Sequence, residues 1–256
     1  MLIKQLFFAL GMMALFLGYS LYTIQKRKKA MPDASRRFFE RTGYRYADLA
    51  GQPLEAHIAY GEQLMKGAAT KGYRIHMIRD FHGVAIHSVQ QYTIETGLTS
   101  TRTSTSYTWT LPLPRPARFH LQIAEKSLRG FAKGVKEAFS SGERVWHQQY
   151  PYEVSTGDPQ FDKRFNVYSD QPQAAAAALG APHLRQMLLQ CAEIDLTVYP
   201  DQIVFADPAQ KNLTAAMGGM VGTMSMATNP GKMMELTIPV HDHVAQVLAT
   251  VFEACA

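Results

Sequence analysis

The fold is decided by residues 73–95, YRIHMIRDFHGVAIHSVQQYTIE. Apolar and polar residues alternate through residues 73–79 and again through residues 83–95, which is the pattern of half-buried β-strands. The Asp-Phe-His-Gly segment at residues 80–83 has the composition of a turn. The stretch therefore predicts an antiparallel hairpin.

Similar patterns extend outward from this hairpin in both directions. Strands are predicted over residues 104–111, 119–124, 165–168, 194–199, 202–206 and 234–238. Helices are predicted over residues 33–42, 55–69, 172–179, 182–192 and 240–254. Because the strands form local hairpins and the helices are grouped, we expect the α+β class, with an N-terminal transmembrane helix followed by an antiparallel-sheet domain with packed helices.

An uncharged apolar run, LFFALGMMALFLGYSLYTI, occupies residues 6–24. As a helix it would span about 28 Å, which is close to the hydrocarbon thickness of a bilayer. We therefore expect one membrane span rather than a buried core helix, with the lipid bilayer as a partner. The anchoring side chains are Leu6, Phe7, Phe8, Leu10, Leu15, Phe16, Leu17, Leu21 and Ile24.

Four basic residues follow the apolar run: Lys26, Arg27, Lys28 and Lys29. A cleaved secretory signal carries its positive charge before the apolar core and a small-residue cleavage site after it, whereas here only Lys4 precedes the core. The positive-inside rule places such a flank, and the domain behind it, in the cytoplasm. We expect a single-pass protein of a cell inner membrane, with an exported domain as the alternative.

The expected organisation has three parts. Residues 1–30 form the transmembrane anchor with its basic flank, residues 31–72 a helical linker region, and residues 73–256 an α+β soluble domain. A division of that domain into subdomains at about 73–150 and 151–256 stays open. Cys191 and Cys255 make no disulfide framework and fit a reducing compartment.

The net charge of +5 belongs to the anchor. Residues 1–30 hold five of the 26 basic residues and none of the 21 acidic residues, so residues 31–256 are neutral overall. Nucleic-acid binding needs a basic patch on the folded domain. We therefore expect no nucleic-acid partner.

The run GDPQFDKRFNVY at residues 157–168 is followed by Asp170, Pro172 and an alanine-rich helix. This GDxxFDxxFxVxxDxP-like segment resembles a pattern in uncharacterised bacterial membrane-anchored proteins of unknown function. The resemblance implies a bacterial inner-membrane protein and implies no reaction. Asp158 and Asp162 within it are explained as well by turn formation around Pro159 as by acid–base chemistry.

Two groups of polar residues are the candidates for an active or metal site. His76, Asp80 and His82 lie on the first hairpin, where His87 would be a cross-strand neighbour of His76. The other group is the triplet of His241, Asp242 and His243 at a predicted helix start, where residues two apart point in different directions. Because nothing marks further ligands, we predict no metal and no cofactor. The sequence also contains no nucleophile elbow and no phosphate-binding fingerprint.

An uncharged segment rich in methionine and small residues, LTAAMGGMVGTMSMA, occupies residues 213–227. Methionine suits adaptable binding surfaces, and thioethers also suit Cu(I). A glycine-rich loop or core filler is the simplest interpretation. A surface for a protein partner or the membrane is the next, formed by Met217, Met220, Met224 and Met226.

The sequence thus favours a single-pass membrane-anchored, non-enzymatic binding or assembly module at the cytoplasmic face. Its protein partner would lie in the membrane or at its cytoplasmic surface, and no small-molecule ligand is indicated. The alternatives are a membrane-tethered enzyme that uses the His and Asp residues above, and an exported metal-binding domain.

Overall fold

The computed structural model describes residues 32–71, 73–96, 101–126, 150–207 and 230–255. Within these residues the strands form one nine-stranded antiparallel sheet in the order β1-β2-β3-β4-β9-β8-β5-β7-β6. The strands are β1 (Arg45–Tyr46), β2 (Tyr73–Phe81), β3 (Val84–Thr96), β4 (Thr101–Pro112), β5 (Leu121–Glu125), β6 (Tyr152–Glu153), β7 (Phe165–Ser169), β8 (Asp195–Val198) and β9 (Gln202–Asp207). The expected α+β class with an antiparallel sheet is confirmed.

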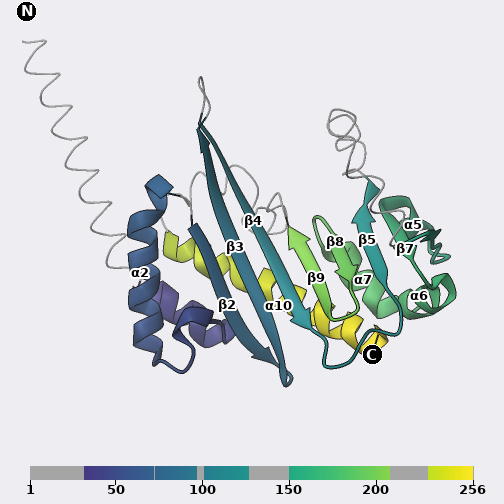
Figure 1. The fold of residues 1–256 in the computed structure, drawn as a ribbon, viewed down its shortest axis with the longest axis horizontal. Coiled ribbons are helices and arrows are strands. Elements are labelled where there is room, and N and C mark those ends of the chain that lie inside the picture. Colours follow the sequence, from purple (N-terminus) through teal and green to yellow (C-terminus); the bar gives the residue numbers. More distant parts are fainter. Residues whose placement is uncertain (1–31, 72, 97–100, 127–149, 208–229, 256) are drawn as a thin grey trace, which may run out of the picture.

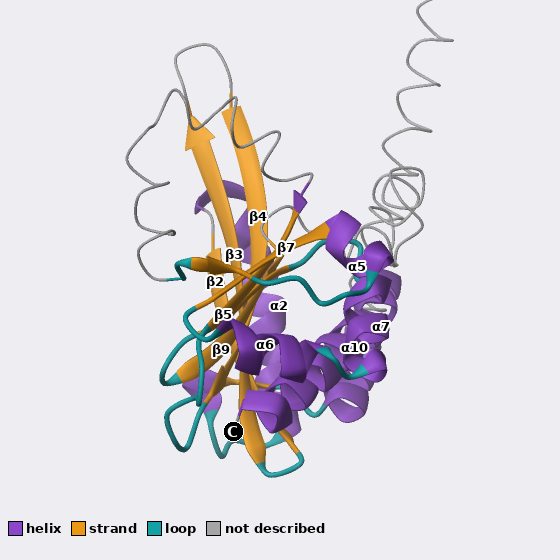
Figure 2. Ribbon diagram, turned by 90° about the vertical axis from the view of Figure 1, so that its right-hand side faces the viewer, coloured by secondary structure: helices purple, strands orange, loops and turns teal. Residues whose placement is uncertain are grey.

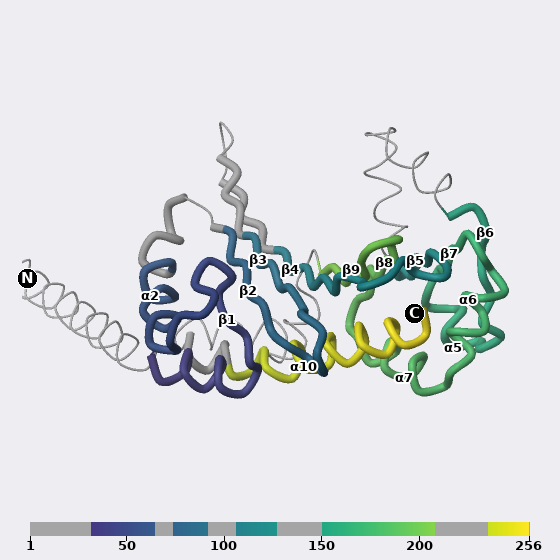
Figure 3. The backbone as a smooth tube through the Cα atoms, turned by 60° about the horizontal axis from the view of Figure 1, so that its bottom comes forward, coloured from purple at the N-terminus to yellow at the C-terminus, as the bar shows by residue number. Residues whose placement is uncertain are grey.

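The helices lie mainly on one face of this sheet (Figure 2). Residues 32–42 are helical, and η1 (Ala47–Leu49), α2 (Leu54–Lys71), α5 (Pro159–Arg164), α6 (Pro172–Leu179), α7 (Pro182–Gln190) and α10 (Pro230–Cys255) follow. α10 runs along the sheet from the β2 side to the β5 side, and α2 stands at the β1–β2 end (Figures 1 and 3). None of the helices that the structure describes covers the opposite face, which we call the open face.

The predicted hairpin of residues 73–95 is confirmed, with a tighter turn than residues 80–83. Phe81 pairs with Val84, so His82 and Gly83 alone form the loop. Both have positive φ, 53° and 80°, as a two-residue turn of the primed type requires. Asp80 Oδ1 accepts a hydrogen bond from the Gly83 amide at 3.0 Å, which ties the side chain to the turn.

The hairpin of β8 and β9 is inserted between strands that follow each other in the sequence. β9 pairs with β4 and β8 pairs with β5, so β4 and β5 are not neighbours. Pro112 ends β4, and the chain after it is tied to the β8–β9 turn by two backbone bonds. The Leu113 amide donates to Asp201 O at 2.8 Å, and the Ala117 amide donates to Pro200 O at 3.0 Å.

The strand predicted over residues 234–238 is wrong, because this segment belongs to α10. Pro239, which we expected to precede the last helix, lies inside α10 and is exposed. The buried positions run at helical spacing through the proline, from Ile238 to His241, Val244 and Leu248. Packing of this stripe on the sheet outweighs the local β-pattern of the sequence.

The core lies between the sheet and its helices, and the N-terminal helical residues belong to it. Phe38 and Phe39 of residues 32–42 are 3% and 1% exposed. They lie in the same buried cluster as Trp109 of β4 and Phe205 of β9. The segment that leads out of the predicted anchor is therefore packed into the domain.

Two predicted features lie outside the described residues: the membrane span of residues 6–24 with its basic flank, and the segment that holds Met217, Met220, Met224 and Met226. In the part of the chain that the structure describes, no helix is both long and apolar enough to cross a membrane. The boundaries proposed at residues 30 and 72 remain predictions.

Candidate functional site

The polar residues singled out from the sequence lie in four separate places. His76 is on the open face of β2, because Met77 and Arg79 beside it are buried on the helix side. Asp80 and His82 belong to the hairpin turn. His241 lies under the sheet, and His243 lies against α7. The sequence-based groups are therefore not brought together into one site. The predicted neighbourhood of His76 and His87 across the hairpin is confirmed, with His76 Nε2 and His87 Nδ1 2.9 Å apart.

His241 is the centre of a buried aromatic cluster between α10, the sheet and residues 32–44. Its side chain is 2% exposed, and its Nδ1 accepts a hydrogen bond from Trp109 Nε1 at 3.1 Å. Burial, and secondly the charge of Arg79, lowers the pKa of His241 to about 3. The imidazole is thus neutral, and its acceptor nitrogen is already in use. Four ring centroids lie 5.2–6.2 Å from it, those of Phe38, Tyr44, Tyr107 and Trp109.

Arg79 and Asp242 form an ion pair beside this cluster that the sequence did not reveal. Arg79 is 8% exposed, and its Nη1 donates to Asp242 Oδ1 at 2.8 Å. The guanidinium carbon also lies 5.5 Å and 4.9 Å from the ring centroids of Tyr44 and Phe81, at cation–π distance. The pair connects β2 to α10 across 163 positions of sequence, and no local pattern signals such a contact.

Three polar atoms at the same interface are buried and have no hydrogen-bond partner among the described residues. They are Arg79 Nε, Tyr44 Oη and Ser88 Oγ. Burial first of all raises the pKa of the Tyr44 phenol far above its usual value, so it stays protonated. The neutral imidazole and phenol and the paired guanidinium form a polar part of the core.

His243 faces away from His241, as expected of residues two apart on a helix. Its Nε2 lies 3.0 Å from Met187 O near the end of α7. Within the described ranges, no three His, Cys, Asp or Glu side chains are grouped closely enough to hold a metal ion. The triplet at residues 241–243 therefore connects three parts of the domain.

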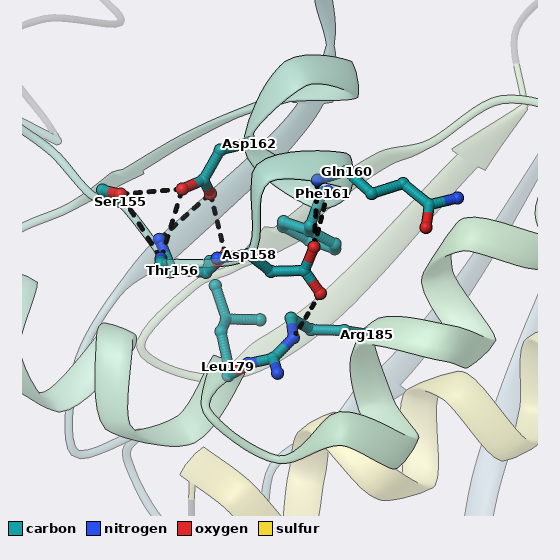
Figure 4. Close-up of polar contacts among 9 residues, drawn as sticks. Ser155, Thr156, Asp158, Gln160, Phe161, Asp162, Leu179 and Arg185 are labelled. Carbon is teal, nitrogen blue, oxygen red and sulfur yellow. Dashed lines mark hydrogen bonds and ion pairs between the residues drawn. The ribbon is translucent and has the colours of Figure 1, made fainter.

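Asp162 of the GDxxFDxxF segment is surrounded by donors from the preceding turn (Figure 4). It accepts hydrogen bonds from Ser155 Oγ at 2.7 Å, Thr156 Oγ1 at 2.8 Å, the Thr156 amide at 3.0 Å and the Gly157 amide at 3.2 Å. Burial acts to raise the pKa of this carboxyl, but the hydrogen bonds outweigh it and lower the pKa. Asp162 is therefore an ionised anchor for the turn.

Asp158 caps α5 and joins it to α7 (Figure 4). Its Oδ1 accepts from the amides of Gln160 and Phe161 at 3.0 and 3.2 Å, as an N-cap residue does. Its Oδ2 accepts from Arg185 Nε at 3.2 Å, and Arg185 Nη1 donates to Leu179 O at 2.7 Å. Of the two sequence interpretations, the contacts favour turn formation, because both carboxylates are occupied by structural donors.

Arg164, the last residue of α5, connects this helix to β5 and to the end of α7. Its guanidinium donates to Glu125 of β5, to the carbonyl oxygen of Leu189 in the last turn of α7, and to those of Cys191 and Ala192 just after that helix. An arginine carries five donors in a fixed fork, which suits it to gather several carbonyl oxygens. The sequence pattern thus encodes a local structural unit around α5.

Together these contacts define an α+β domain built on an antiparallel sheet whose helices lie mainly on one side, with buried polar groups that serve structure. No family model matches the sequence, and no curated protein matches it. Among solved structures, the mycobacterial trehalose monomycolate transport factor A matches with a TM-score of 0.36 and 13% identity, over 79% of this chain and 95% of that chain. At this TM-score the likeness carries no inference about function.

Proposed function

We propose that this chain is a single-pass membrane-anchored binding or assembly module, held at the cytoplasmic face of a bacterial inner membrane. Its role would be to present a folded surface to a protein partner in or on that membrane. The observation that carries the proposal is the separation of the polar candidates. His76, the His82 turn, His241 and His243 occupy four environments, and the contacts of Asp158 and Asp162 are structural.

Catalysis by general acid–base or nucleophilic groups needs side chains within hydrogen-bond reach of one another around a substrate. His241 is buried among aromatic rings, with its acceptor nitrogen bonded to Trp109. His243 lies against a backbone carbonyl. The described residues therefore favour the binding role over the alternative of a membrane-tethered enzyme.

The spacing between the anchor and the domain supports a role close to the bilayer. Seven residues separate Ile24 from residue 32, the first described residue, and even a fully extended chain of that length would reach at most roughly 25 Å. The domain would therefore stay near the headgroups. A partner would be met at the membrane surface or within the membrane.

The open face offers a surface for such a partner. Antiparallel sheets commonly keep one face towards water, and there the exposed side is expected to be polar. Here the open face mixes polar Thr108 and Thr110 with aliphatic Ile78, Val89 and Val204, all partly buried. A non-obligate interface is about as apolar as the rest of a protein surface, so this composition allows a partner to bind here.

The orientation is tested first, with reporters fused to the C-terminus of the full chain. A reporter that is active only in the cytoplasm should be active, and a reporter that is active only in the periplasm should be silent. The opposite pattern would overturn the cytoplasmic placement and support the exported alternative.

Binding is tested by photo-crosslinking in cells, with the crosslinker placed at Thr108 on the open face. The matched control is the exposed Gln246 on the solvent side of α10. We expect a discrete adduct from position 108 that position 246 does not give. Identical adduct patterns at both positions, or none at either, would contradict a partner-binding open face.

A further inference from the structure

We propose that His76 and His87 form a two-histidine site on the open face that binds a divalent transition metal ion, Cu²⁺ or Ni²⁺. This site does not depend on the role proposed above, because it would exist whether or not the domain has a protein partner. It also revises the expectation from the sequence that the chain binds no metal.

The two imidazoles are in direct contact through a hydrogen bond, so one ion could be reached by both. His76 Nε2 and His87 Nδ1 are 2.9 Å apart, and the rings are near-parallel, with centroids at 5.2 Å and an interplanar angle of 29°. His76 pairs with Val89 and His87 pairs with Ile78, so the histidines are diagonal neighbours on adjacent strands. Long side chains reach each other across such a diagonal.

The spacing fits two neighbouring positions of a tetragonal or octahedral ion. Imidazole nitrogens lie about 2.0–2.1 Å from a bound ion, so two ligands at 90° stand about 2.9 Å apart. Cu²⁺ and Ni²⁺ adopt tetragonal nitrogen and oxygen sites, in which two imidazoles and water can share the coordination. Zn²⁺ usually takes at least three protein ligands, and the described residues group no third His, Cys, Asp or Glu with this pair.

The hydrogen bond between the two rings must open before an ion can bind between them. In the metal-free pair, one of the two facing nitrogens carries a proton and donates a hydrogen bond to the other, which accepts it. Binding requires that this proton move to the other nitrogen of the same ring, and that both rings rotate slightly until their lone pairs converge on the ion.

The two histidines lie on directly paired strands and can be reached from solvent. The strands are joined by a two-residue turn only a few positions away, and both histidines are partly exposed. Ile78 and Val89 on the same face flank the rings with aliphatic surface, and water would complete the coordination. The nearest charged residues on this face of β2 are Arg74 and Asp80, both exposed.

The test is a Cu²⁺ titration of the full chain in mild detergent, followed by electron paramagnetic resonance. We expect a bound ion with two equatorial nitrogen ligands. His76→Ala and His87→Ala should each reduce the affinity by roughly tenfold or more and leave a spectrum with fewer nitrogen ligands. Calorimetric titration with Ni²⁺ should rank the wild type and the variants in the same order of affinity.

The matched control is His82→Ala, because His82 is exposed on the same hairpin but lies in the turn. It should bind Cu²⁺ as the wild type does. Circular dichroism on His76→Gln and His87→Gln separates loss of a ligand from loss of the fold. Unchanged affinity and nitrogen count in a variant that lacks both His76 and His87, or no binding by the wild type, would overturn the site.

Discussion

The single carboxylate of Asp162 stabilises the turn formed by residues 155–157. Its oxygens accept four hydrogen bonds from Ser155, Thr156 and Gly157, which precede it in the chain. The sequence indicated a turn around Pro159, and the capping role of Asp158 follows from that pattern. The role of Asp162 could not be predicted in the same way. Half of its hydrogen-bond donors are backbone amides, and the sequence does not show where a backbone amide will point.

Asp162→Asn is expected to destabilise the fold by about 2–3 kcal/mol, because the amide group turns an NH₂ towards donors that need an acceptor. Chemical denaturation at pH 7 measures the effect. The neighbouring exposed Lys163→Gln is the control and should stay within about 0.5 kcal/mol of wild type. Equal stability of the two variants would show that the turn does not depend on this carboxylate.

His241 gives the fold a pH dependence whose sign can be derived. Its pKa is about 3 in the folded state and about 6.5 when unfolded, so the unfolded chain binds more protons between these values. The stability that neutral His241 contributes is complete above pH 6.5 and falls by at most about 1.4 kcal/mol per pH unit below it.

Urea denaturation at pH 7, 6 and 5 measures this slope, and His241→Gln is the matching variant, since its amide oxygen can still accept from Trp109. The variant should lose less stability than the wild type as the pH falls from 7 to 5. Parallel slopes would mean that His241 titrates in the folded protein much as it does in the unfolded chain.

The hairpin of β2 and β3 is the element that the sequence predicts best, because its signals are local. Strand alternation and a glycine in the turn are both readable without knowledge of distant contacts. The turn is nevertheless two residues shorter than predicted, since the pairing of Phe81 with Val84 is decided by the register of the whole ladder.

Two substitutions in this turn should have different effects on the free energy of unfolding. Gly83→Ala places a Cβ at φ 80° and should cost about 1–2 kcal/mol, whereas His82→Gly relieves a non-glycine residue at φ 53° and should be neutral or slightly stabilising. Thermal unfolding of the two variants checks this. A destabilised His82→Gly together with a neutral Gly83→Ala would contradict the observed turn geometry.

Helix α10 is the element where the local pattern misleads. The alternation before Pro239 predicted a strand, and the proline itself predicted the start of a new helix. In the structure one helix includes both the alternating segment and the proline, because its buried face packs on the sheet. Pro239→Ala should therefore stabilise the protein by about 1–2 kcal/mol, because the alanine amide restores a helical hydrogen bond at an exposed position.

Denaturant unfolding of Pro239→Ala beside Gln246→Ala, an exposed control on the same helix, tests this expectation. The control should change stability by less than about 0.5 kcal/mol. A loss of stability in Pro239→Ala would show that the packing of α10 requires the shape that the proline imposes.

The whole molecule shows where prediction from sequence ends. Most strands and helices were found, because periodicity and proline or glycine positions are local signals. The order of the strands in the sheet was not predicted. It depends on pairings such as that of Trp109 on β4 with Phe205 on β9, which lie far apart in the chain. The ion pair of Arg79 and Asp242 has the same long-range character.

The last prediction concerns the junction between the expected anchor and the domain. Phe38 and Phe39 are buried against the sheet and its helices, and the ring of Phe38 contacts His241 at 5.5 Å between centroids. The helical residues 32–42 should therefore belong to the cooperative unit. A chain that begins at residue 32 should unfold in a single transition without detergent.

A chain that begins at residue 43 lacks both phenylalanines and should lose the cooperative transition, because truncation of one buried aromatic side chain alone costs about 3–5 kcal/mol. Phe38→Ala in the longer chain is the milder test and should lower the midpoint of unfolding without abolishing the transition. If the chain from residue 43 were as stable as the chain from residue 32, residues 32–42 would be a linker rather than part of the fold. If it unfolds, residues 32–42 belong to the cooperative unit, and an anchor at residues 6–24 would be followed closely by a helix that is packed into the core.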